Sequence, residues 1–197
     1  DVYISDSIQE ALLASEPIVA LETAVLTAGL PKTKWNTSFG GGPSYIDSQR
    51  PINIALAQSM TDTVQTNGAL PAWIAVINGT LRIGLASDEL TQLASNPVAG
   101  KVSLATLAQA MHAKQSAGTT VATTLLACRL ASTKNPIRVF ATGGIGGIHQ
   151  NWTNRLDISA DLTALATTPT CVIASGAKSI LDIPATVESL ETIGVPV

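Results

Sequence analysis

The sequence predicts an α/β fold in which helices pack on a mostly buried sheet. Short apolar runs rich in β-branched residues alternate along the chain with segments of helical periodicity, which is the pattern of strand–helix units. Hydrophobic residues make up 46% of the 197 residues, and charged residues make up only 13%. No internal repeat and no linker divides the sequence, so we expect residues 1–197 to form a single domain.

The individual elements follow from the length and the period of each apolar segment. Five short, β-rich runs predict strands at 17–22, 72–79, 80–85, 137–142 and 170–175. Apolar side chains at helical spacing predict helices at 52–68, 87–95, 104–113, 119–132, 158–167, 177–183 and 185–194. In the first of these helices Ile54, Met60 and Val64 share one side and Gly68 ends it, whereas Ser87 is the expected N-cap of the second.

The segment from Pro31 to Pro51 has a different composition from the rest of the chain. It is rich in Gly, Ser, Thr and Pro, and therefore predicts a long, mobile inserted loop over residues 31–51. Long loops beside strand ends often cover active sites, so we expect this loop to form a lid near Glu22. A surface insertion without a function is the alternative interpretation.

Charge and cysteine content narrow the class of protein. The net charge is −3 and the basic residues do not cluster, which argues against a nucleic-acid-binding surface. No apolar run reaches the ~18 residues of a membrane span, and the first residues lack the pattern of a signal peptide. Cys128 and Cys171 have apolar neighbours and no metal-binding spacing, so we expect two buried, reduced thiols in a reducing, cytoplasmic compartment. The low charge also favours association between copies of the chain.

Polar residues follow three of the predicted strands. Glu22 closes the first strand, four glycines and His149 follow the fourth, and Lys178 follows the fifth. Ligands of α/β proteins bind at the carboxyl ends of the strands. If these strands are parallel, the three groups converge on one rim of the sheet, where the sequence predicts a functional site.

Two motifs near these strand ends each allow two interpretations. The stretch "TGGIGGIH" (142–149) lets backbone N–H groups approach an anion, but it equally suits a tight turn. It differs from the dinucleotide motif G-x-G-x-x-G, because His149 stands where the last glycine should be. In "LDISADL" the carboxylates of Asp157 and Asp161 suit Mg²⁺ or Mn²⁺, or else the capping and surface charge of a helix start.

The lysines and a threonine-rich segment also leave alternatives open. Lys178 in an apolar, glycine-lined pocket would lose hydration and act as a free amine that forms a Schiff base, whereas a lysine that extends into solvent is the alternative. Lys101 suits a phosphate contact or plain surface charge. The stretch 117–124, "AGTTVATT", suits a phosphate cradle at a helix start or ordinary helix capping.

Six segments taken together resemble one known family. They are "VALETAVLTAGLP", "NGALPAWIAVINGTLRIGL", "GTTVATT", "VFATGGIGGIH", "LDISADL" and "ASGAKSILD". Their order and spacing are similar to those of the pseudouridine-5′-phosphate glycosidases, a family that includes the indigoidine-cluster proteins. The resemblance runs from about Ile8 to Val197 and is interrupted by the insertion 31–51. It implies a three-layer α/β/α fold with a mostly parallel sheet and a homotrimer.

The resemblance also implies an activity and a mechanism. Members of the family reversibly cleave the C–C bond of pseudouridine 5′-phosphate to give uracil and ribose 5-phosphate. By its motif, Lys178 resembles the nucleophile that captures the anomeric carbon as an imine, and Glu22 resembles the proton donor. An imine suits this bond because a C-nucleoside has no heteroatom leaving group at the anomeric carbon, so two carboxylates alone do not suffice.

Further site residues are implied by the same matches. The substrate-contacting positions of the family match Lys101, Val121, Ser159, Ala160 and Asp161. Asp157 matches the ligand of a Mn²⁺ ion, which the family holds largely through water molecules. The implied partners are therefore small molecules: pseudouridine 5′-phosphate, ribose 5-phosphate and uracil.

The sequence departs from the family pattern at several positions. Ala28, Leu104–Thr106 and Gln150 stand where the family usually has basic or ionisable residues, which weakens the expected phosphate contacts. Family members also continue beyond the position of Val197, and the part that follows completes the sheet and adds an active-site asparagine. Two alternatives follow from these departures: a catalytically weak or inactive homologue with a structural or regulatory role, or a Schiff-base lyase that acts on another sugar phosphate.

Overall fold

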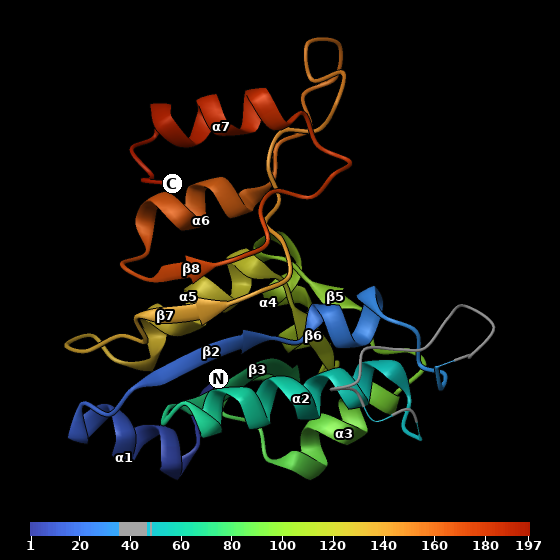
Figure 1. Ribbon diagram of the computed structural model, residues 1–197, viewed down its shortest axis with the longest axis vertical. Helices are drawn as coiled ribbons and strands as arrows, with labels where there is room; N and C mark the ends of the chain where they lie inside the picture. Colours follow the sequence, from blue (N-terminus) through green and yellow to red (C-terminus); the bar gives the residue numbers. More distant parts are fainter. Residues whose placement is uncertain (36–46, 48) are drawn as a thin grey trace.

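The computed structural model describes residues 1–35, 47 and 49–197. Eight strands of these residues belong to one sheet (Figure 1): β1 Val2–Ile4, β2 Ile18–Glu22, β3 Leu70–Ile77, β4 Thr80–Ile83, β5 Lys101–Val102, β6 Ala117–Thr119, β7 Val139–Ala141 and β8 Cys171–Ile173. The α-helices are α1 Asp6–Ala14, α2 Ile52–Thr66, α3 Ser87–Ser95, α4 Leu104–His112, α5 Val121–Ala131, α6 Ala160–Thr167 and α7 Ile183–Thr192. A π-helical turn, η1, covers Val25–Gly29.

The sheet is mostly parallel, as predicted. Its strands follow the order β1-β4-β3-β2-β7-β8, with β6 paired to β3 and β5 paired to β6. The pairs β1–β4, β2–β3, β2–β7, β5–β6 and β7–β8 are parallel, whereas β4 and β6 run antiparallel to β3. Strand β2 therefore lies in the middle of four parallel strands, and its carboxyl end opens on the same rim as those of β7 and β8.

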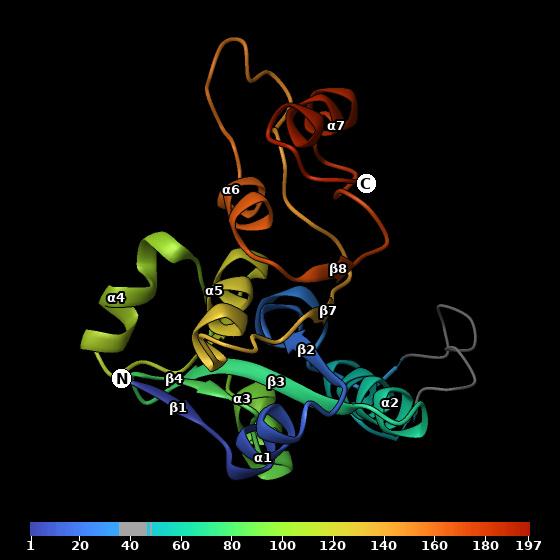
Figure 2. The same cartoon turned by 90° about the vertical axis from the view of Figure 1, so that its left-hand side faces the viewer.

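Helices cover both faces of the sheet, which confirms the three-layer α/β/α arrangement (Figure 2). Alternate side chains of β3 point to opposite faces. Ile74 and Val76 belong to the core cluster that α5 completes, whereas Trp73 packs with residues of α2 and α3. The sheet is thus buried on both sides, and this explains why its strands read as continuous apolar runs in the sequence.

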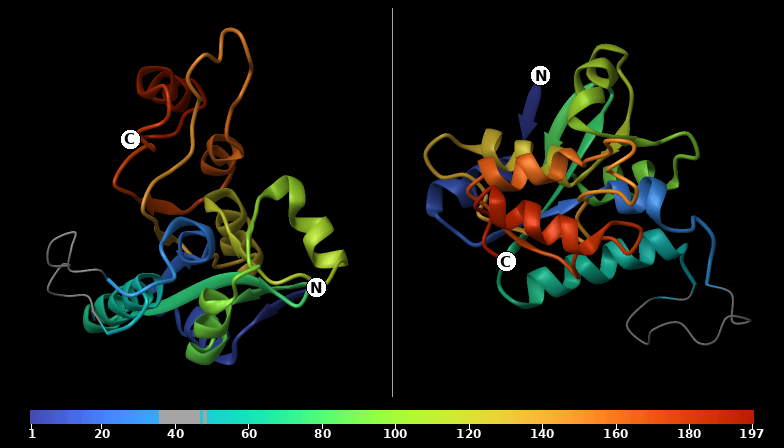
Figure 3. Two further views of the ribbon diagram at one scale, coloured as in Figure 1. Left: turned by 90° about the vertical axis from the view of Figure 1, so that its right-hand side faces the viewer. Right: turned by 90° about the horizontal axis from the view of Figure 1, so that it is seen from above.

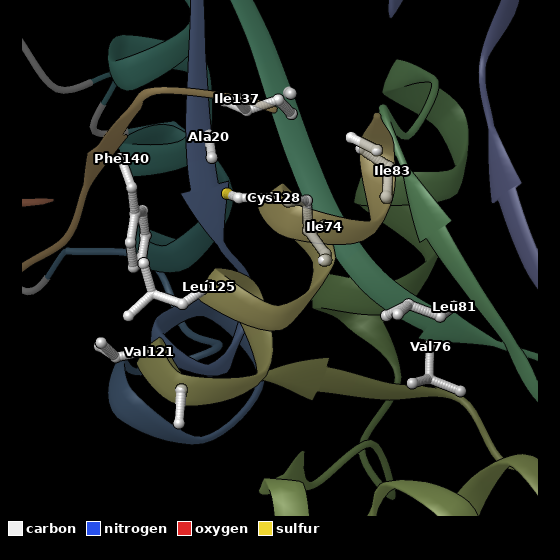
Figure 4. Close-up of a cluster of buried hydrophobic side chains, with 14 of the residues drawn as sticks. Ala20, Ile74, Val76, Leu81, Ile83, Val121, Leu125, Cys128, Ile137 and Phe140 are labelled. Atoms are coloured by element: carbon white, nitrogen blue, oxygen red, sulfur yellow. The ribbon is translucent and has the colours of Figure 1, made fainter. Parts of the chain in front are cut away.

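The main core forms where α5 packs on the central strands. Val121, Leu125 and Cys128 recur at helical spacing along α5 and face Ala20 of β2 and Ile74 of β3 (Figure 4). All five are at most 1% exposed. This packing fixes α5 beneath the carboxyl end of β2 and so positions the elements that surround the predicted site.

Beyond β7 the chain forms a smaller stack. Helix α6, strand β8 and helix α7 extend from one edge of the sheet (Figures 1 and 3). Their common core is small and consists of Ile148, Leu162 and Leu190. The described residues contain no helix with both the length and the apolar composition needed to cross a membrane.

One predicted helix is wrong. Residues 177–183 do not form a helix, because their backbone pairs with the glycine loop instead: Ala177 bridges Ile145, and Leu181 bridges His149. Helix α7 begins only at Ile183, where the side chain of Asp182 accepts a hydrogen bond from the amide of Ala185. Helical spacing in so short a segment is a weak signal, and the sheet-like pairing of the backbone outweighs it.

Three smaller expectations also need correction. Ser87 is the first residue of α3 and not its N-cap, which is Ala86; the Glu89 side chain accepts from the amide of Ala86. The predicted helix 119–132 begins at Val121, because Ala117–Thr119 forms β6. Cys128 is buried as expected, but Cys171 is exposed, since β8 lies at an edge of the sheet.

Most of the predicted loop 31–51 lies outside the described residues, and so does the predicted lid. The two ends of the segment lie side by side. Lys34 bridges Pro51, and the amide of Ile52 donates to the carbonyl oxygen of Thr33 at 2.9 Å. The segment therefore leaves and rejoins the domain at one place, between η1 and α2.

Candidate active site

Glu22 ends the central strand β2 and is almost completely buried, with 9% of its surface exposed. Burial is the largest influence on its pKa, and it raises the pKa above the ordinary value for a glutamate. A hydrogen bond from Thr142 and the positive charges of Lys178 and Lys101 act in the opposite direction, while the negative charge of Asp161 adds to the rise. A raised pKa brings a buried carboxyl closer to the range in which a general acid can donate a proton near neutral pH.

A backbone ladder connects the end of β7 to Lys178. Strands β7 and β8 pair in parallel, and the pairing continues past both strands into the loops. The amide of Thr142 donates to the carbonyl oxygen of Ile173 at 2.9 Å, and that of Ile145 donates to Gly176 at 3.0 Å. The amide of Lys178 then donates to the carbonyl oxygen of Ile145 at 3.1 Å. The glycine loop therefore holds the backbone of Lys178 at the same rim as Glu22.

The side chain of Lys178 is exposed to solvent. The sequence left two interpretations open: an amine desolvated in an apolar pocket, or a lysine that extends into solvent. Among the described residues Lys178 has the second of these environments and extends into solvent. They set the position of the lysine and bring its charge close enough to influence Glu22, but they do not remove its ammonium group from water.

Asp161 links the glycine loop to the start of α5. Its side chain is buried, and both carboxylate oxygens accept backbone hydrogen bonds. Oδ1 accepts from the amide of Ala122 at 2.9 Å, and Oδ2 accepts from the amide of Gly146 at 2.8 Å. A Cβ atom at position 146 would lie 2.8 Å from Oδ2 and still closer to the Ser159 side chain, so the close approach requires glycine.

This link decides between the two interpretations of 117–124. The N-terminus of α5 attracts an anion, and the carboxylate of Asp161 occupies that position. The hydroxyl of Thr119 donates to the carbonyl oxygen of Ile74, and that of Thr123 donates to Val102. These hydroxyls bind strand carbonyls, and Thr120, the N-cap residue of α5, makes no capping hydrogen bond with its side chain. The start of α5 is therefore capped by Asp161 from outside the segment.

Of the remaining predicted substrate contacts, Val121, Ser159 and Ala160 lie around this link. Val121 begins α5 and is 1% exposed, with its side chain in the main core. Ser159 is the N-cap of α6, where its hydroxyl accepts from the amide of Asp161 at 3.2 Å, and Ala160 is exposed. Lys101 is exposed on β5, beside a hollow of about 640 Å³ that Lys114 also lines.

Asp157 lies on the exposed segment that precedes α6. Its carbonyl oxygen accepts from the amide of His149 at 2.9 Å, and its carboxylate makes no hydrogen bond or ion pair with the residues that the structure describes. The part of the chain that the structure describes contains no group of three or more His, Cys, Asp or Glu side chains able to hold a metal ion. A single carboxylate fits an ion held mostly by water molecules, and it does not fit a closed metal site.

Thr142 belongs to the site, although the sequence motifs did not single it out. Its hydroxyl donates a hydrogen bond to Oε1 of Glu22. The available signal was its register: Leu21 pairs with Ala141, so Glu22 and Thr142 each follow the last pair of two neighbouring parallel strands. That register depends on which strands are neighbours, which the sequence does not state.

The fold and the site define a class: a three-layer α/β protein with a buried acid and a lysine at the carboxyl rim of its parallel strands. Such rims are where α/β enzymes bind small molecules. The sequence profile of the family described as "Indigoidine synthase A like protein" matches residues 47–197. The chain belongs to this family, as the sequence motifs predicted.

Two curated relatives share a name. The chain is 43% identical over 196 residues to a "Pseudouridine-5′-phosphate glycosidase" of Glaesserella parasuis, covering 100% of this chain and 58% of the relative. It is 42% identical over 196 residues to a protein of the same name from Staphylococcus aureus, covering 100% of this chain and 57% of the relative. The chain thus spans a little over half the length of these relatives.

Two solved structures share the fold. One is the prealnumycin C-glycosynthase AlnA in complex with ribulose 5-phosphate, with a TM-score of 0.77, 34% identity and coverage of 99% of this chain and 56% of that chain. The other is an indigoidine synthase A-like protein from Thermotoga maritima, with a TM-score of 0.76, 28% identity and the same coverage. Both likenesses extend over nearly the whole of this chain.

Proposed function

We propose that this chain carries the acid and the nucleophile of a pseudouridine-5′-phosphate glycosidase. One observation carries the proposal: a buried Glu22 with a raised pKa lies under the influence of Lys178, and Thr142 and the glycine loop join the two segments. The names of the curated relatives support pseudouridine 5′-phosphate as the proposed substrate. The reaction would convert pseudouridine 5′-phosphate and water to uracil and ribose 5-phosphate.

In this mechanism Lys178 and Glu22 divide the chemistry. The uncharged amine of Lys178 bonds to the anomeric carbon as the bond from that carbon to the ring oxygen breaks, and the amine proton passes to the ring oxygen. The nitrogen lone pair then forms the C=N bond of an imine as the C–C bond breaks, and the electrons of the C–C bond pass to the uracil carbon. Glu22 donates its proton to the uracil carbon as the C–C bond breaks. Water then hydrolyses the imine, which releases ribose 5-phosphate and restores the lysine.

The binding roles remain proposals at the level of single residues. Lys101 supplies a positive charge for the substrate phosphate, and Val121 and Ser159–Asp161 border the site around the Asp161 link. We propose Mn²⁺ at Asp157, held mainly through water, where the ion would supply positive charge beside the bound phosphate. A homotrimer and a cytoplasmic location stay predictions; light scattering after size-exclusion chromatography tests the first.

A direct assay tests the proposal. Purified chain is incubated with pseudouridine 5′-phosphate and Mn²⁺, uracil is measured by chromatography, and borohydride traps any imine for peptide mapping. We expect uracil release and a ribose 5-phosphate adduct on Lys178, with both lost in Lys178→Ala. Lys134→Ala, a substitution of another exposed lysine, should leave both unchanged. Absence of both products from the unmodified chain would contradict the proposal.

A second function, a structural or regulatory homologue without turnover, is favoured by one observation: Lys178 is exposed. A nucleophilic lysine is typically desolvated in an apolar pocket, and the described residues form no such enclosure around Lys178. This alternative predicts that the biological effect of the chain survives Lys178→Ala. If the effect disappears with the lysine, the alternative fails and the enzymatic proposal gains support.

A further inference from the structure

We propose that Thr142 is a positioning residue that holds the Glu22 carboxyl group through Oε1 and so leaves Oε2 to carry and deliver the proton. The inference rests on the role of Glu22 as the acid, proposed above. The geometry of the two strand ends, one hydrogen bond and the charges around Glu22 support this role.

The two strand ends place the residues side by side. Strands β2 and β7 are parallel, and Leu21 pairs with Ala141. Glu22 is held on its other side by pairing with Ile74 of β3. The backbone of Thr142 is held by its bond to Ile173 of β8. Strand pairing therefore fixes both backbones. Thr142 is β-branched, so its side chain has few χ1 rotamers and its hydroxyl has few possible positions.

The hydrogen bond distinguishes the two carboxyl oxygens. Thr142 donates its hydroxyl proton to Oε1 of Glu22. A protonated carboxyl has one oxygen that carries the proton and one that accepts hydrogen bonds. The hydroxyl donor makes Oε1 the accepting oxygen, so in the protonated form of Glu22 the exchangeable proton resides on Oε2. No other hydroxyl, amide or ammonium donor to Oε1 occurs among the hydrogen bonds of the described residues.

Because of the charges around Glu22, loss of this hydrogen bond should produce a measurable change in the pKa of Glu22. Burial and the negative charge of Asp161 raise the pKa of Glu22, whereas Lys178, Lys101 and the Thr142 hydroxyl lower it. The hydroxyl stabilises the ionised form that remains after proton transfer. Removing it takes away one of the influences that oppose burial, so the pKa of Glu22 should rise further.

The same hydrogen bond joins the acid to the segment of the nucleophile. Thr142 is the first residue of the backbone ladder that runs through the glycine loop to Lys178. A carboxyl group fixed to Thr142 is thus fixed relative to the lysine backbone. Without the hydroxyl, Glu22 would keep its chemistry but lose its orientation toward the group with which it must act.

The test compares Thr142→Val, which removes the hydroxyl and keeps the shape, with Thr142→Ser, which keeps the hydroxyl. Thr170→Val is the matched control, because its hydroxyl donates to the carbonyl oxygen of Ile137 at the opposite ends of β7 and β8. Carbon-13 NMR of the glutamate carboxyl groups follows the titration in the ligand-free chain, and the signal missing from Glu22→Gln assigns Glu22. We expect a higher midpoint for Glu22 in Thr142→Val and an unchanged midpoint in Thr142→Ser and Thr170→Val.

Activity provides a second arm. If the chain turns over pseudouridine 5′-phosphate, Thr142→Val should lower kcat by about tenfold, the effect of losing one charge-assisted hydrogen bond, with little change in KM. Thr142→Ser, which keeps the hydroxyl, should retain most of the kcat of the unmodified chain. Absence of turnover would contradict the proposed function. The titration of Glu22 would still test the positioning role of Thr142. An unchanged Glu22 midpoint in Thr142→Val would overturn the positioning role, whatever the activity.

Discussion

The two ends of the sheet bury their side chains to very different degrees. From β1 to β7 the strands and α5 form a continuous core, in which Ile74, Leu125 and Phe140 are 0% exposed. After Thr142 the chain contributes Ala164 to this core and otherwise builds the small cluster around Leu162. Nine of the sixteen exposed large hydrophobic residues of the described structure lie in residues 143–197. We call these two parts the packed region (residues 1–142, as described) and the open region (residues 143–197).

The difference teaches how the environments of the two candidate catalytic groups arise. Glu22 belongs to the packed region, and the described residues are sufficient to bury it. Lys178 belongs to the open region, beside the edge strand β8 and a groove of about 740 Å³ between β8 and α7. Apolar surface of this kind is typical of contact with other protein. The described residues therefore bury the acid, whereas they leave the lysine exposed.

Substitutions of single apolar side chains should show the largest difference in stability between the packed region and the open region. Phe140→Ala in β7 should lower the free energy of unfolding by about 4 kcal/mol, because it leaves a cavity in the packed region. Ile173→Ala in β8 should cost less than about 0.5 kcal/mol, since that side chain is 57% exposed. Urea denaturation followed by circular dichroism measures both. Equal losses for the two variants would mean that the open region is packed in solution.

The link between the regions should show the next largest effect. Asp161→Ala removes the acceptor for the amides of Ala122 and Gly146, which leaves two backbone donors without a partner. We expect a loss of about 2–3 kcal/mol in urea denaturation. Asp157→Asn is the control, because its exposed side chain should change stability by less than about 0.5 kcal/mol. If Asp161→Ala left the free energy of unfolding unchanged, the link would not hold the two regions together.

A smaller effect concerns the pH dependence of the packed region. Burial raises the pKa of Glu22 above its unfolded value, so stability from this group is fully present below the unfolded pKa and is lost as pH rises through the folded pKa. Glu22→Gln keeps an oxygen that accepts from Thr142 and cannot ionise. We expect it to be more stable than the unmodified chain by about 1 kcal/mol at pH 8 and equally stable below pH of about 4.

The measurement is a series of denaturation curves across pH for both proteins. Glu89→Gln is a poor control because Glu89 pairs with Arg82 at 3.0 Å, so Glu10→Gln on the exposed surface of α1 serves instead. A difference that stays constant from pH 4 to pH 8 would show that ionisation of Glu22 does not limit stability.

The smallest expected effect is a difference in thiol reactivity, which tests the contrast between the two regions without altering stability. Cys171 in the open region is exposed, whereas Cys128 in the packed region is buried and its pKa is raised to about 12. A thiol-alkylating reagent at pH 8 should modify Cys171 in the folded chain and reach Cys128 only after denaturant is added. Mass spectrometry of the digested protein measures both. Modification of the two thiols at similar rates would mean that the packed region opens readily.

Much of the fold could be read from the sequence because its signals are local. The helices 52–68 and 104–113 and the strand 72–79 were predicted close to their observed bounds, since each has a long apolar pattern of one period. The segment 177–183 was misread as a helix, because what decides its structure is pairing with residues about thirty positions earlier. The edge position of β8, which exposes Cys171, has the same long-range origin.

The sequence by itself determined the α/β class, the family and the residues that the family motifs mark, because residue types and their spacing are local properties of the chain. Only the tertiary structure decided which strands are neighbours, and therefore that Thr142 meets Glu22 and that Asp161 spans Ala122 and Gly146. It also decided that Glu22 is buried while Lys178 is exposed. Burial and hydrogen bonding depend on what distant segments bring to a side chain, and those are the quantities that set its chemistry.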